Sequence, residues 1–225
     1  MAGPKITLYV DTVSPFGYEA YYILRHDEAF KGCDITYVPI SLGGLMQKCG
    51  NIPPLKIKNK DTWINLERLR WAKHFTIPMT TSLPPDFPAR TLPIMRALCA
   101  VAGSDSSPKQ QQARLVQALD TFFSQYWEHS VATHRPEELK ETLVGLFGES
   151  EAERILTDST TPETKQALIT NTDAAFSAGA FGLPWMVCTN PQGETQGFFG
   201  VDHIGQVVQF LGLGKGGGTG WRSLL

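Results

Sequence analysis

The segment at residues 11–20, DTVSPFGYEA, places a serine and a proline where an apolar run gives way to a helical pattern. Ser14 can accept the backbone N–H bonds that are unpaired at a helix N-terminus, and Pro15 is pre-set for the first helical position. The same position can hold an anion, because the N–H groups and the helix dipole both favour negative charge there. Two interpretations of Ser14 therefore stay open: a helix cap, and a hydroxyl that helps to bind an anion such as a thiolate.

The sequence does not support other chemistry around this serine. The serine-hydrolase motif G-x-S-x-G is absent, and no motif places a histidine near Ser14. The cysteines form neither a C-x-x-C pair nor a zinc-ligand spacing with histidine: Cys33, Cys49, Cys99 and Cys188. We therefore expect no metal, and we expect the cysteines to be buried apolar side chains in a reducing compartment.

The composition is typical of a packed domain without a strongly charged partner. The chain of 225 residues is 42% hydrophobic and 19% charged, and its formal net charge of −2 favours neither nucleic acid nor a membrane surface as a partner. No stretch approaches the roughly 18 apolar residues of a membrane span, and the N-terminus lacks a signal-peptide pattern. We expect a cytoplasmic protein. Residues 223–225, SLL, only faintly resemble a peroxisomal S-K-L ending, so peroxisome and mitochondrion rank behind the cytoplasm.

Strand patterns lie on both sides of the segment that contains Ser14. KITLYVD is typical of a buried strand, PFGYEAYYILRHDEAF has helical spacing, and CDITYVPI is a second strand. A strand–helix–strand unit with short connections predicts that the two strands are parallel. The Gly- and Pro-rich stretch SLGGLMQKCGNIPPLKIKNK then predicts a long loop with short helical turns, a kind of loop that is often functional.

The remaining chain changes from helices back to strands. Residues 61 to about 179 have a mostly helical pattern with stops between the segments. Strands return with PWMVCT and TQGFFG, which flank NPQGE as a hairpin connection. Asp202 is expected to cap a last helix, HIGQVVQFLG, that ends at Gly212.

Neither end of the chain has enough strands for a sheet of its own. Joined, the two ends give four strands, two parallel and two antiparallel, which is the thioredoxin architecture. We therefore predict an α/β, thioredoxin-like fold with a large all-helical domain inserted after the first βαβ unit. Residues 1–60 and 180–214 would form the thioredoxin-like domain, residues 61–179 the helical domain, and residues 215–225 a flexible Gly-rich tail.

In thioredoxin-like proteins the turn after the first strand carries the redox chemistry. Here that turn is SPFG, with Ser14 and Gly17 where a dithiol protein has two cysteines. Disulfide exchange needs a thiolate, so this turn cannot perform it. A hydroxyl at a helix N-terminus can instead donate a hydrogen bond to a bound thiolate, and the adjacent N–H groups and the dipole would add to that stabilisation.

Four segments resemble one known family. YVDTVSPFGYEA, GNIPPLKIKNK, GAFGLPWMV and FFGVDHIGQV look like the signature segments of kappa-class glutathione transferases, and equally like those of the related 2-hydroxychromene-2-carboxylate isomerases in the DsbA-like lineage. The resemblance runs over nearly the whole chain in order. It implies glutathione as substrate or cofactor, a small-molecule electrophile as partner, and a homodimer.

The resemblance also assigns roles to residues. Ser14 matches the catalytic serine that hydrogen-bonds the glutathione sulfur. Asn51 and Lys60 match loop residues that hold the glycine end of glutathione, although Lys56 and Lys58 are local competitors for Lys60. In GAFGLP, the resemblance implies that Pro184 is cis and that the backbone of Leu183 pairs with the cysteinyl unit like an added strand.

The γ-glutamyl end of glutathione has a less complete match. Asp202 matches the acid that binds the γ-glutamyl ammonium, and Glu67 matches an acidic position that reaches the γ-glutamyl group of the neighbouring subunit. Val201 stands where the family usually has serine; it keeps a backbone N–H for the γ-glutamyl carboxylate but loses a hydroxyl donor. A hydrogen bond to a charged group contributes roughly 1.5–3 kcal/mol, so this difference bears on glutathione affinity.

A second difference concerns the electrophile pocket, which the resemblance assigns to Phe16, Gly17 and Tyr18. The usual family pattern is Ser-Pro-aromatic-Ser-Trp. Gly17 lacks a second hydroxyl near the sulfur, and Tyr18 has a phenol where an indole is usual. We therefore expect a pocket that differs from the usual one. The alternative role of Tyr18, shared with Tyr21 and Tyr22, is packing of the helix.

Three functions stay open from the sequence. The first is a glutathione transferase, in which the thiolate attacks an electrophile. The second is a cis-trans isomerase, in which the same thiolate adds reversibly to a conjugated enone and leaves after a bond rotates. The third is a non-catalytic protein that binds glutathione or an apolar molecule, which the presence of Val201 and Gly17 favours.

Overall fold

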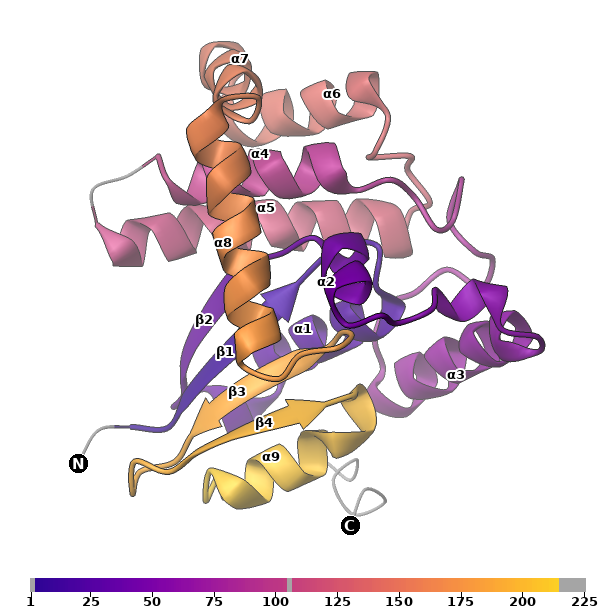
Figure 1. Cartoon of the computed structure of the whole chain (residues 1–225), viewed down its shortest axis with the longest axis vertical. Coiled ribbons are helices and arrows are strands. Elements are labelled where there is room, and N and C mark those ends of the chain that lie inside the picture. Colours follow the sequence, from indigo (N-terminus) through magenta and orange to yellow (C-terminus); the bar gives the residue numbers. More distant parts are fainter. Residues whose placement is uncertain (1–2, 105–106, 215–225) are drawn as a thin grey trace.

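A four-stranded mixed sheet lies at the centre of the computed structural model, which describes residues 3–104 and 107–214 (Figure 1). The strand order is β2-β1-β3-β4. The strands are β1 (Lys5–Val10), β2 (Asp34–Pro39), β3 (Trp185–Thr189) and β4 (Thr195–Phe199). β1 pairs in parallel with β2 and antiparallel with β3, and β3 pairs antiparallel with β4. The predicted βαβ unit and C-terminal hairpin are both confirmed.

The strand directions bring four chain segments to one edge of the sheet. β1 and β2 end there, β3 begins there and β4 ends there, with Val10 beside Pro39, Tyr9 beside Trp185, and Trp185 beside Phe199. The loops that follow β1, β2 and β4, and the loop that precedes β3, therefore meet at this edge. We call it the Ser14 edge, because Ser14 lies in the loop after β1.

Helices make up most of the chain between the second and third strands, and no strand lies between Pro39 and Trp185 in the described part of the chain. The α-helices are α1 (Pro15–His26), α2 (Leu42–Lys48), α3 (Lys60–Phe75), α4 (Leu92–Ala102), α5 (Pro108–Trp127), α6 (Pro136–Phe147), α7 (Glu149–Asp158), α8 (Pro162–Ser177) and α9 (Ile204–Phe210). Short 3-10 helices are η1 (Glu28–Phe30), η2 (Pro54–Lys56) and η3 (Val201–His203). The predicted fold class, a thioredoxin-like sheet with a helical insertion, is confirmed. The predicted tail at residues 215–225 lies outside the described residues.

Alternation along β1 distributes its side chains between two apolar clusters. Ile6, Leu8 and Val10 belong to the large cluster that also contains buried residues of α1, α4, α5 and α9. Tyr9 points to the opposite face, into a smaller cluster with Leu45 of α2 and residues near the end of α8. In Figure 1, α8 accordingly crosses one face of the sheet, and it packs against both β2 and α2.

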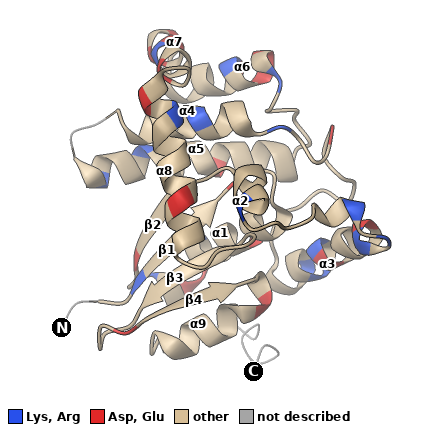
Figure 2. Cartoon of the chain, in the orientation of Figure 1, with Lys and Arg blue, Asp and Glu red and all other residues tan. Residues whose placement is uncertain are grey.

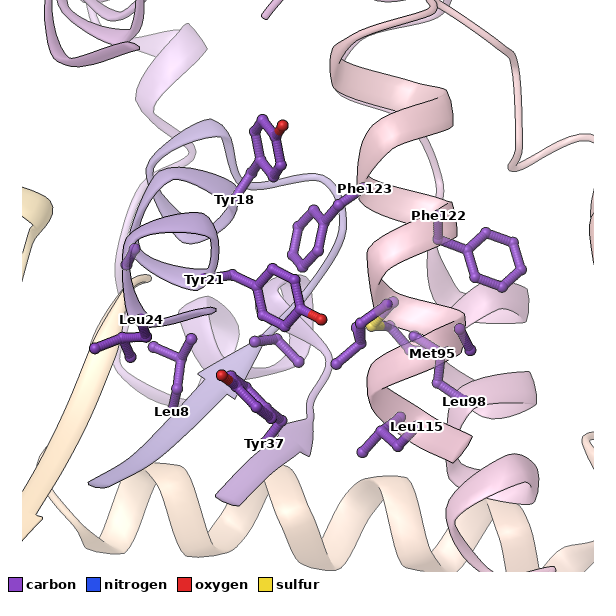
Figure 3. Packing of buried hydrophobic residues seen from close by; sticks show 14 of the residues in the cluster. Leu8, Tyr18, Tyr21, Leu24, Tyr37, Met95, Leu98, Leu115, Phe122 and Phe123 are labelled. Carbon is purple, nitrogen blue, oxygen red and sulfur yellow. The ribbon is translucent and has the colours of Figure 1, made fainter. Parts of the chain in front are cut away.

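A group of aromatic rings joins α1 to the helical layer (Figure 3). The ring of Tyr21 lies 5.0 Å from that of Phe123 on α5 and 5.0 Å from that of Tyr37 on β2. Its hydroxyl donates a hydrogen bond of 2.7 Å to Asp120. Because aromatic side chains bury large areas and a buried Tyr hydroxyl needs a partner, this group fixes how α5 lies against α1.

Asp11 fastens the loop after β1 to two other parts of the chain. Its side chain is 2% exposed and accepts hydrogen bonds from the Thr91 hydroxyl (2.6 Å), the Leu42 N–H (2.9 Å) and the Val13 N–H (3.2 Å). Burial raises the pKa of Asp11, and these three hydrogen bonds oppose that rise. The carboxylate therefore holds the start of α2 and the start of α4 at the Ser14 edge.

Within the described residues, no helix has the length and apolar character needed to cross a bilayer. The same residues contain no group of three or more His, Cys, Asp or Glu side chains that could hold a metal ion.

The Asp11 contacts predict a pH-dependent effect of Thr91→Val. The substitution removes a buried bond to a charged acceptor, so we expect it to lower the free energy of unfolding by about 1.5–3 kcal/mol near pH 7. Thr91 stabilises the ionised form of Asp11, so the loss should shrink as pH falls through the raised pKa of Asp11 and the carboxyl becomes protonated. Urea unfolding of parent and variant at a series of pH values measures it.

Thr142→Val is the matched control. The Thr142 side chain is also buried, but its hydroxyl lies 2.7 Å from two neutral acceptor oxygens, Gln125 Oε1 and Glu138 O. Its loss of stability should therefore not change over the same pH range. If the two variants show the same pH dependence, Thr91 does not act on an ionised Asp11.

Candidate functional site

Ser14 caps the N-terminus of α1, as the sequence predicts. Its backbone is extended (φ −84°, ψ 115°), and its hydroxyl oxygen accepts a hydrogen bond of 3.0 Å from the Gly17 N–H. The Ser14 N–H donates to the backbone carbonyl oxygen of Asp11 at 3.1 Å, which ties the cap to the same residue whose carboxylate is buried. In the described part of the chain the hydroxyl proton has no hydrogen-bond acceptor, so Ser14 can serve as a cap and still donate a hydrogen bond.

Gly17 leaves room around that hydroxyl. A Cβ at this position would lie 3.0 Å from Ser14 Cβ and 3.1 Å from Ser14 Oγ. Both distances are shorter than side-chain contacts usually are, so any larger residue would require the Ser14 side chain to move by a few tenths of an ångström. The glycine therefore permits the observed position of the Ser14 side chain, and it also lacks a hydroxyl of its own.

The loop before β3 contains a cis peptide bond between Leu183 and Pro184, which confirms the sequence prediction. A second cis bond, between Phe87 and Pro88, is not predicted by the sequence. Leu183 is 6% exposed, yet neither its N–H nor its C=O has a hydrogen-bond partner among the residues that the structure describes. Buried backbone groups are almost always paired, so these two are suited to pair with an extended ligand.

Asn51 is joined to this same loop. Its side-chain amide donates a hydrogen bond of 2.9 Å to Phe181 O, and the nearby Cys49 thiol donates to Ala180 O at 3.4 Å. The structure therefore brings the loop after α2 against the Leu183 loop. Asn51 is exposed, so its amide oxygen stays accessible beside the Leu183 backbone.

The turn after β4 completes the Ser14 edge. The Gly200 N–H donates to Pro184 O at 3.1 Å, which attaches this turn to the cis-proline loop. Gly200 has φ of +92°, and a Cβ there would lie only 2.2 Å from Asp202 Oδ1. The Asp202 carboxylate is thus folded back over the glycine, half-exposed, with Oδ2 3.3 Å from His203 Nδ1.

The prediction that Asp202 caps the last helix is wrong. Asp202 lies inside η3, and α9 begins only at Ile204, with His203 at the N-cap position and no side-chain cap bond. A 3-10 turn ahead of the helix displaces Asp202 from the cap position. Val201, beside it, is 2% exposed and packs in the large apolar cluster, so its side chain is not available to a ligand.

The residues expected on α3 lie beside the Ser14 edge without a hydrogen bond to it. Phe16 of α1 contacts Trp63 of α3, with ring centroids 6.2 Å apart, which places α3 alongside α1. Lys60 is the exposed first residue of α3. Glu67 pairs with Arg70 at 3.0 Å and borders a shallow surface cavity on this helix.

Tyr18, which the resemblance assigns to the electrophile pocket, lies in the core. It is 2% exposed, its ring is 5.4 Å from that of Phe123, and its hydroxyl lies 2.8 Å from Glu128 Oε1 and 2.9 Å from Pro78 O, both acceptors. Burial, and next the Glu128 carboxylate, raise the pKa of Tyr18 far above its usual value. Little of this side chain is left to contact a ligand, whereas Phe16 is only partly buried.

Three charged residues around the edge are not identified by the sequence reasoning. The sequence signal for Asp11 is its position, because it is a carboxylate between a buried strand and a capping serine. Glu19 is the one charge within GYEAYYIL, an otherwise uncharged helical stretch. Arg68 of α3 carries no comparable signal, because its helix has charges on every side. Glu19 and Arg68 are both 0% exposed.

Comparisons with known proteins agree with this fold. The family model described as DSBA-like thioredoxin domain matches residues 5–212. Glutathione S-transferase kappa 1 of Caenorhabditis elegans is 27% identical over 92% of this chain and 91% of its own length, and that of Homo sapiens is 26% identical over 92% and 90%. A solved structure of 2-hydroxychromene-2-carboxylate isomerase superposes with a TM-score of 0.71 at 22% identity, covering 92% of this chain and 94% of that chain.

The Gly200 geometry predicts a specific effect of Gly200→Ala. The positive φ disfavours any residue with a Cβ, so the free energy of unfolding should fall by about 1–2 kcal/mol. The new Cβ would also displace the Asp202 carboxylate, because the two cannot occupy the same space. Urea unfolding measures the first effect, and the carboxyl 13C signal of Asp202 measures the second.

Gly193→Ala separates the two effects. Gly193 also has a positive φ, +87°, but a Cβ there would meet nothing within 4 Å. It should lose stability through backbone strain and leave the Asp202 signal unchanged. An Asp202 signal that is the same in the parent and in Gly200→Ala would show that the carboxylate does not lie over Gly200.

Proposed function

The chain belongs to the DSBA-like thioredoxin domain family, and on that premise we propose that it is a glutathione transferase of the kappa type. In this proposal the thiolate of bound glutathione is stabilised at Ser14 and attacks a small electrophile. The names of the curated relatives support glutathione as the thiol. The observation that carries the proposal is Ser14 itself, a helix-capping hydroxyl whose proton is free to bond a thiolate.

The protein's own cysteines do not supply the reacting sulfur. The turn at Ser14 contains no thiol. Burial raises the pKa of Cys33 to about 11 and the pKa values of Cys99 and Cys188 to about 12. At neutral pH these three side chains stay as poorly nucleophilic thiols. The fourth, Cys49, donates its thiol hydrogen bond to Ala180 O at 3.4 Å, so in this proposal the reactive thiolate comes from a bound molecule.

The start of α1 supplies the groups that would stabilise a thiolate. Ser14 offers its O–H, Pro15 has no N–H, and the Gly17 N–H is taken by Ser14 Oγ. The Phe16 N–H is then the first-turn donor that has no acceptor within the helix, and the helix dipole favours an anion at this point. A free thiol has a pKa near 8.5, and lowering it by about two units needs roughly 2.7 kcal/mol of preferential thiolate binding, which these groups can supply together.

The rest of the tripeptide would lie across the Ser14 edge. We assign the cysteinyl unit to the unpaired N–H and C=O of Leu183, beside Pro184. The glycine end would lie toward Asn51 and Lys60, where Figure 2 shows Lys and Arg gathered on α3 and the segment before it. The γ-glutamyl end would lie toward the Val201 backbone and the half-exposed Asp202 carboxylate, whose charge suits an ammonium group.

The reaction itself needs no further group from the protein. The thiol proton leaves to solvent, the sulfur forms a bond to an electrophilic carbon, and a leaving group departs with the electron pair. Phe16 and Trp63, partly exposed beside Ser14, would contact an apolar electrophile. The cytoplasm, which is reducing, is the compartment that we propose, because the four cysteines are unpaired.

The proposal predicts that Ser14→Ala raises the pKa of bound glutathione by about one to two pKa units, the equivalent of one charge-assisted hydrogen bond of roughly 1.5–3 kcal/mol. Binding should change less, because Leu183, Asn51 and Asp202 still hold the tripeptide. Transfer activity near pH 7 should fall and partly recover at higher pH. Thiolate absorbance against pH, in the presence of glutathione, is the measurement.

Ser41→Ala is the matched control for the loss of a helix cap. Ser41 caps α2 in the same way, with its hydroxyl oxygen 3.2 Å from the Gly44 N–H. It should lose roughly 1 kcal/mol of stability and leave the thiol pKa unchanged. If Ser14→Ala and the parent give superimposable titrations, Ser14 is only a cap. If glutathione is ionised but regenerated at the end of each turnover, the activity is an isomerisation.

We further propose a homodimer formed through α3 and the segment before it. Trp63 and Leu66 are each 48% exposed, and Ile52 and Ile57 are 57% and 41% exposed. Apolar side chains gathered at one place on a surface mark an interaction site. A partner molecule seated there would also lie next to Glu67, for which the family resemblance implies a contact with the neighbouring subunit's ligand.

Leu66→Glu tests the dimer, because a charge in an apolar interface opposes association. Light scattering at micromolar concentration should give twice the chain mass of 24.8 kDa for the parent and a single chain mass for the variant. Ile169→Glu on α8, where the side chain is 50% exposed, is the control and should stay dimeric. A parent of single chain mass, or two variants that behave alike, would contradict this arrangement.

A further inference from the structure

Two buried charges lie between α1 and α3, below the Ser14 edge. Glu19 is on the second turn of α1, and Arg68 is on the part of α3 that packs against α1. Both residues are 0% exposed. Burying a charge costs free energy unless the charge is paired and hydrogen-bonded. These two charges lie on α1, the helix that Ser14 caps, and on α3, which packs against it.

Within the part of the chain that the structure describes, Arg68 donates hydrogen bonds only to neutral oxygens. Its Nε and Nη2 donate to Asn65 Oδ1 at 3.0 and 2.7 Å, Nη1 donates to Thr80 O at 2.7 Å, and Nη2 also donates to Thr81 O at 2.9 Å. These bonds hold the guanidinium in place but do not cancel its charge.

Arg68 is also connected to the Ser14 turn through one aromatic ring. Its guanidinium carbon lies 5.9 Å from the ring centroid of Trp127. The indole N–H of Trp127 donates a hydrogen bond of 2.9 Å to Thr12 O, two residues before Ser14. The field of a buried cation acts beyond its direct contacts, because the surrounding protein screens it less than water would.

Glu19 has no hydrogen-bond partner for either carboxyl oxygen within the described residues. The charged groups that face it are Arg68 and Glu67 from α3, and Tyr18 next to it in the chain makes its hydrogen bond to Glu128 at the end of α5. Burial raises the pKa of Glu19; Arg68 opposes that rise and Glu67 adds to it. A carboxyl group in this setting stays protonated to a higher pH than an exposed one.

We infer that Arg68 is a buried cation that stabilises an anion held at the Ser14 turn, and that Glu19 removes this stabilisation when it ionises. The inference rests on the proposed function, because the anion in question is the thiolate of bound glutathione. Arg68 touches neither the sulfur nor Ser14, so it is a positioning residue that acts through its field.

The protonation of Glu19 sets the sign of the effect. While Glu19 is protonated, the pair carries the single positive charge of Arg68 and favours a thiolate. Once Glu19 ionises, the pair is neutral and the thiolate loses that support. By linkage, a bound thiolate must raise the pKa of Glu19 by as much as an ionised Glu19 raises the pKa of the thiol.

The experiment is a titration of glutathione thiolate absorbance against pH, in the presence of the parent and of three variants. Glu19→Gln cannot ionise and should lower the thiol pKa relative to the parent over the pH range in which Glu19 of the parent is ionised, a range that the carboxyl 13C signal of Glu19 defines. Arg68→Met removes the cation and should raise it. Each shift should be up to about one pKa unit, the size expected for a unit charge about 10–15 Å away in a medium of effective dielectric constant about 20. Arg68→Lys keeps the charge and should stay close to the parent.

Opposite shifts in Glu19→Gln and Arg68→Met are the result that a purely structural pair would not give, because loss of packing would weaken the site in both. Arg68→Met leaves the Thr80 and Thr81 carbonyls unpaired; if it does not fold, Glu19→Gln still decides the matter. As a second measurement, the carboxyl 13C signal of Glu19 should titrate at higher pH when glutathione is bound.

The outcomes separate this inference from the proposed function. If the parent itself does not lower the pKa of glutathione, the proposed function fails. If the parent lowers it while the Glu19→Gln curve superimposes on that of the parent, or shifts in the same direction as the Arg68→Met curve, the proposed function stands and the inference about Arg68 and Glu19 is overturned.

Discussion

The antiparallel pairing of β1 with β3 is the constraint on which the site depends. It joins two segments from opposite ends of the chain and sets Tyr9 opposite Trp185. With that register, the loop that leaves β1 and the loop that enters β3 meet at one edge, so Ser14 and the unpaired backbone of Leu183 face the same region. A shift of the register by one residue would turn every side chain of β1 to the other face of the sheet and disrupt the packing of both apolar clusters.

The helical layer does more than cover the sheet. Thr91, at the start of α4, donates to Asp11, and Trp127, at the end of α5, donates to Thr12 O. Both bonds reach the short loop that places Ser14 at the start of α1. The helices between β2 and β3 thus determine the position of a residue that lies near the N-terminus, and the site is a property of the whole chain.

Patterns within a few residues of the sequence predict part of the fold and part of the candidate site. The strands, the serine cap and the C-terminal hairpin follow from patterns within a few residues, and the cis bond at Pro184 follows from resemblance in a short motif. Asp202 was misplaced as a cap because a 3-10 turn and a helix begin with similar residues. The helical spacing of Tyr18 indicates packing as one of its two roles, but its partners Glu128 and Pro78 are distant in the sequence and could not be predicted. The proximity of Glu19 and Arg68 could not be predicted either, because it arises only when α1 and α3 pack together.

The separation of the paired strands along the chain also has a consequence for protein synthesis. β1 and β2 leave the ribosome long before β3 is made, so the central strand spends most of translation with one side unpaired. Contacts between distant segments form slowly, and exposed strand edges pair readily with other chains. The free edge of β1 is therefore open to pairing with other chains until β3 is made, except where the helices made in the meantime cover it.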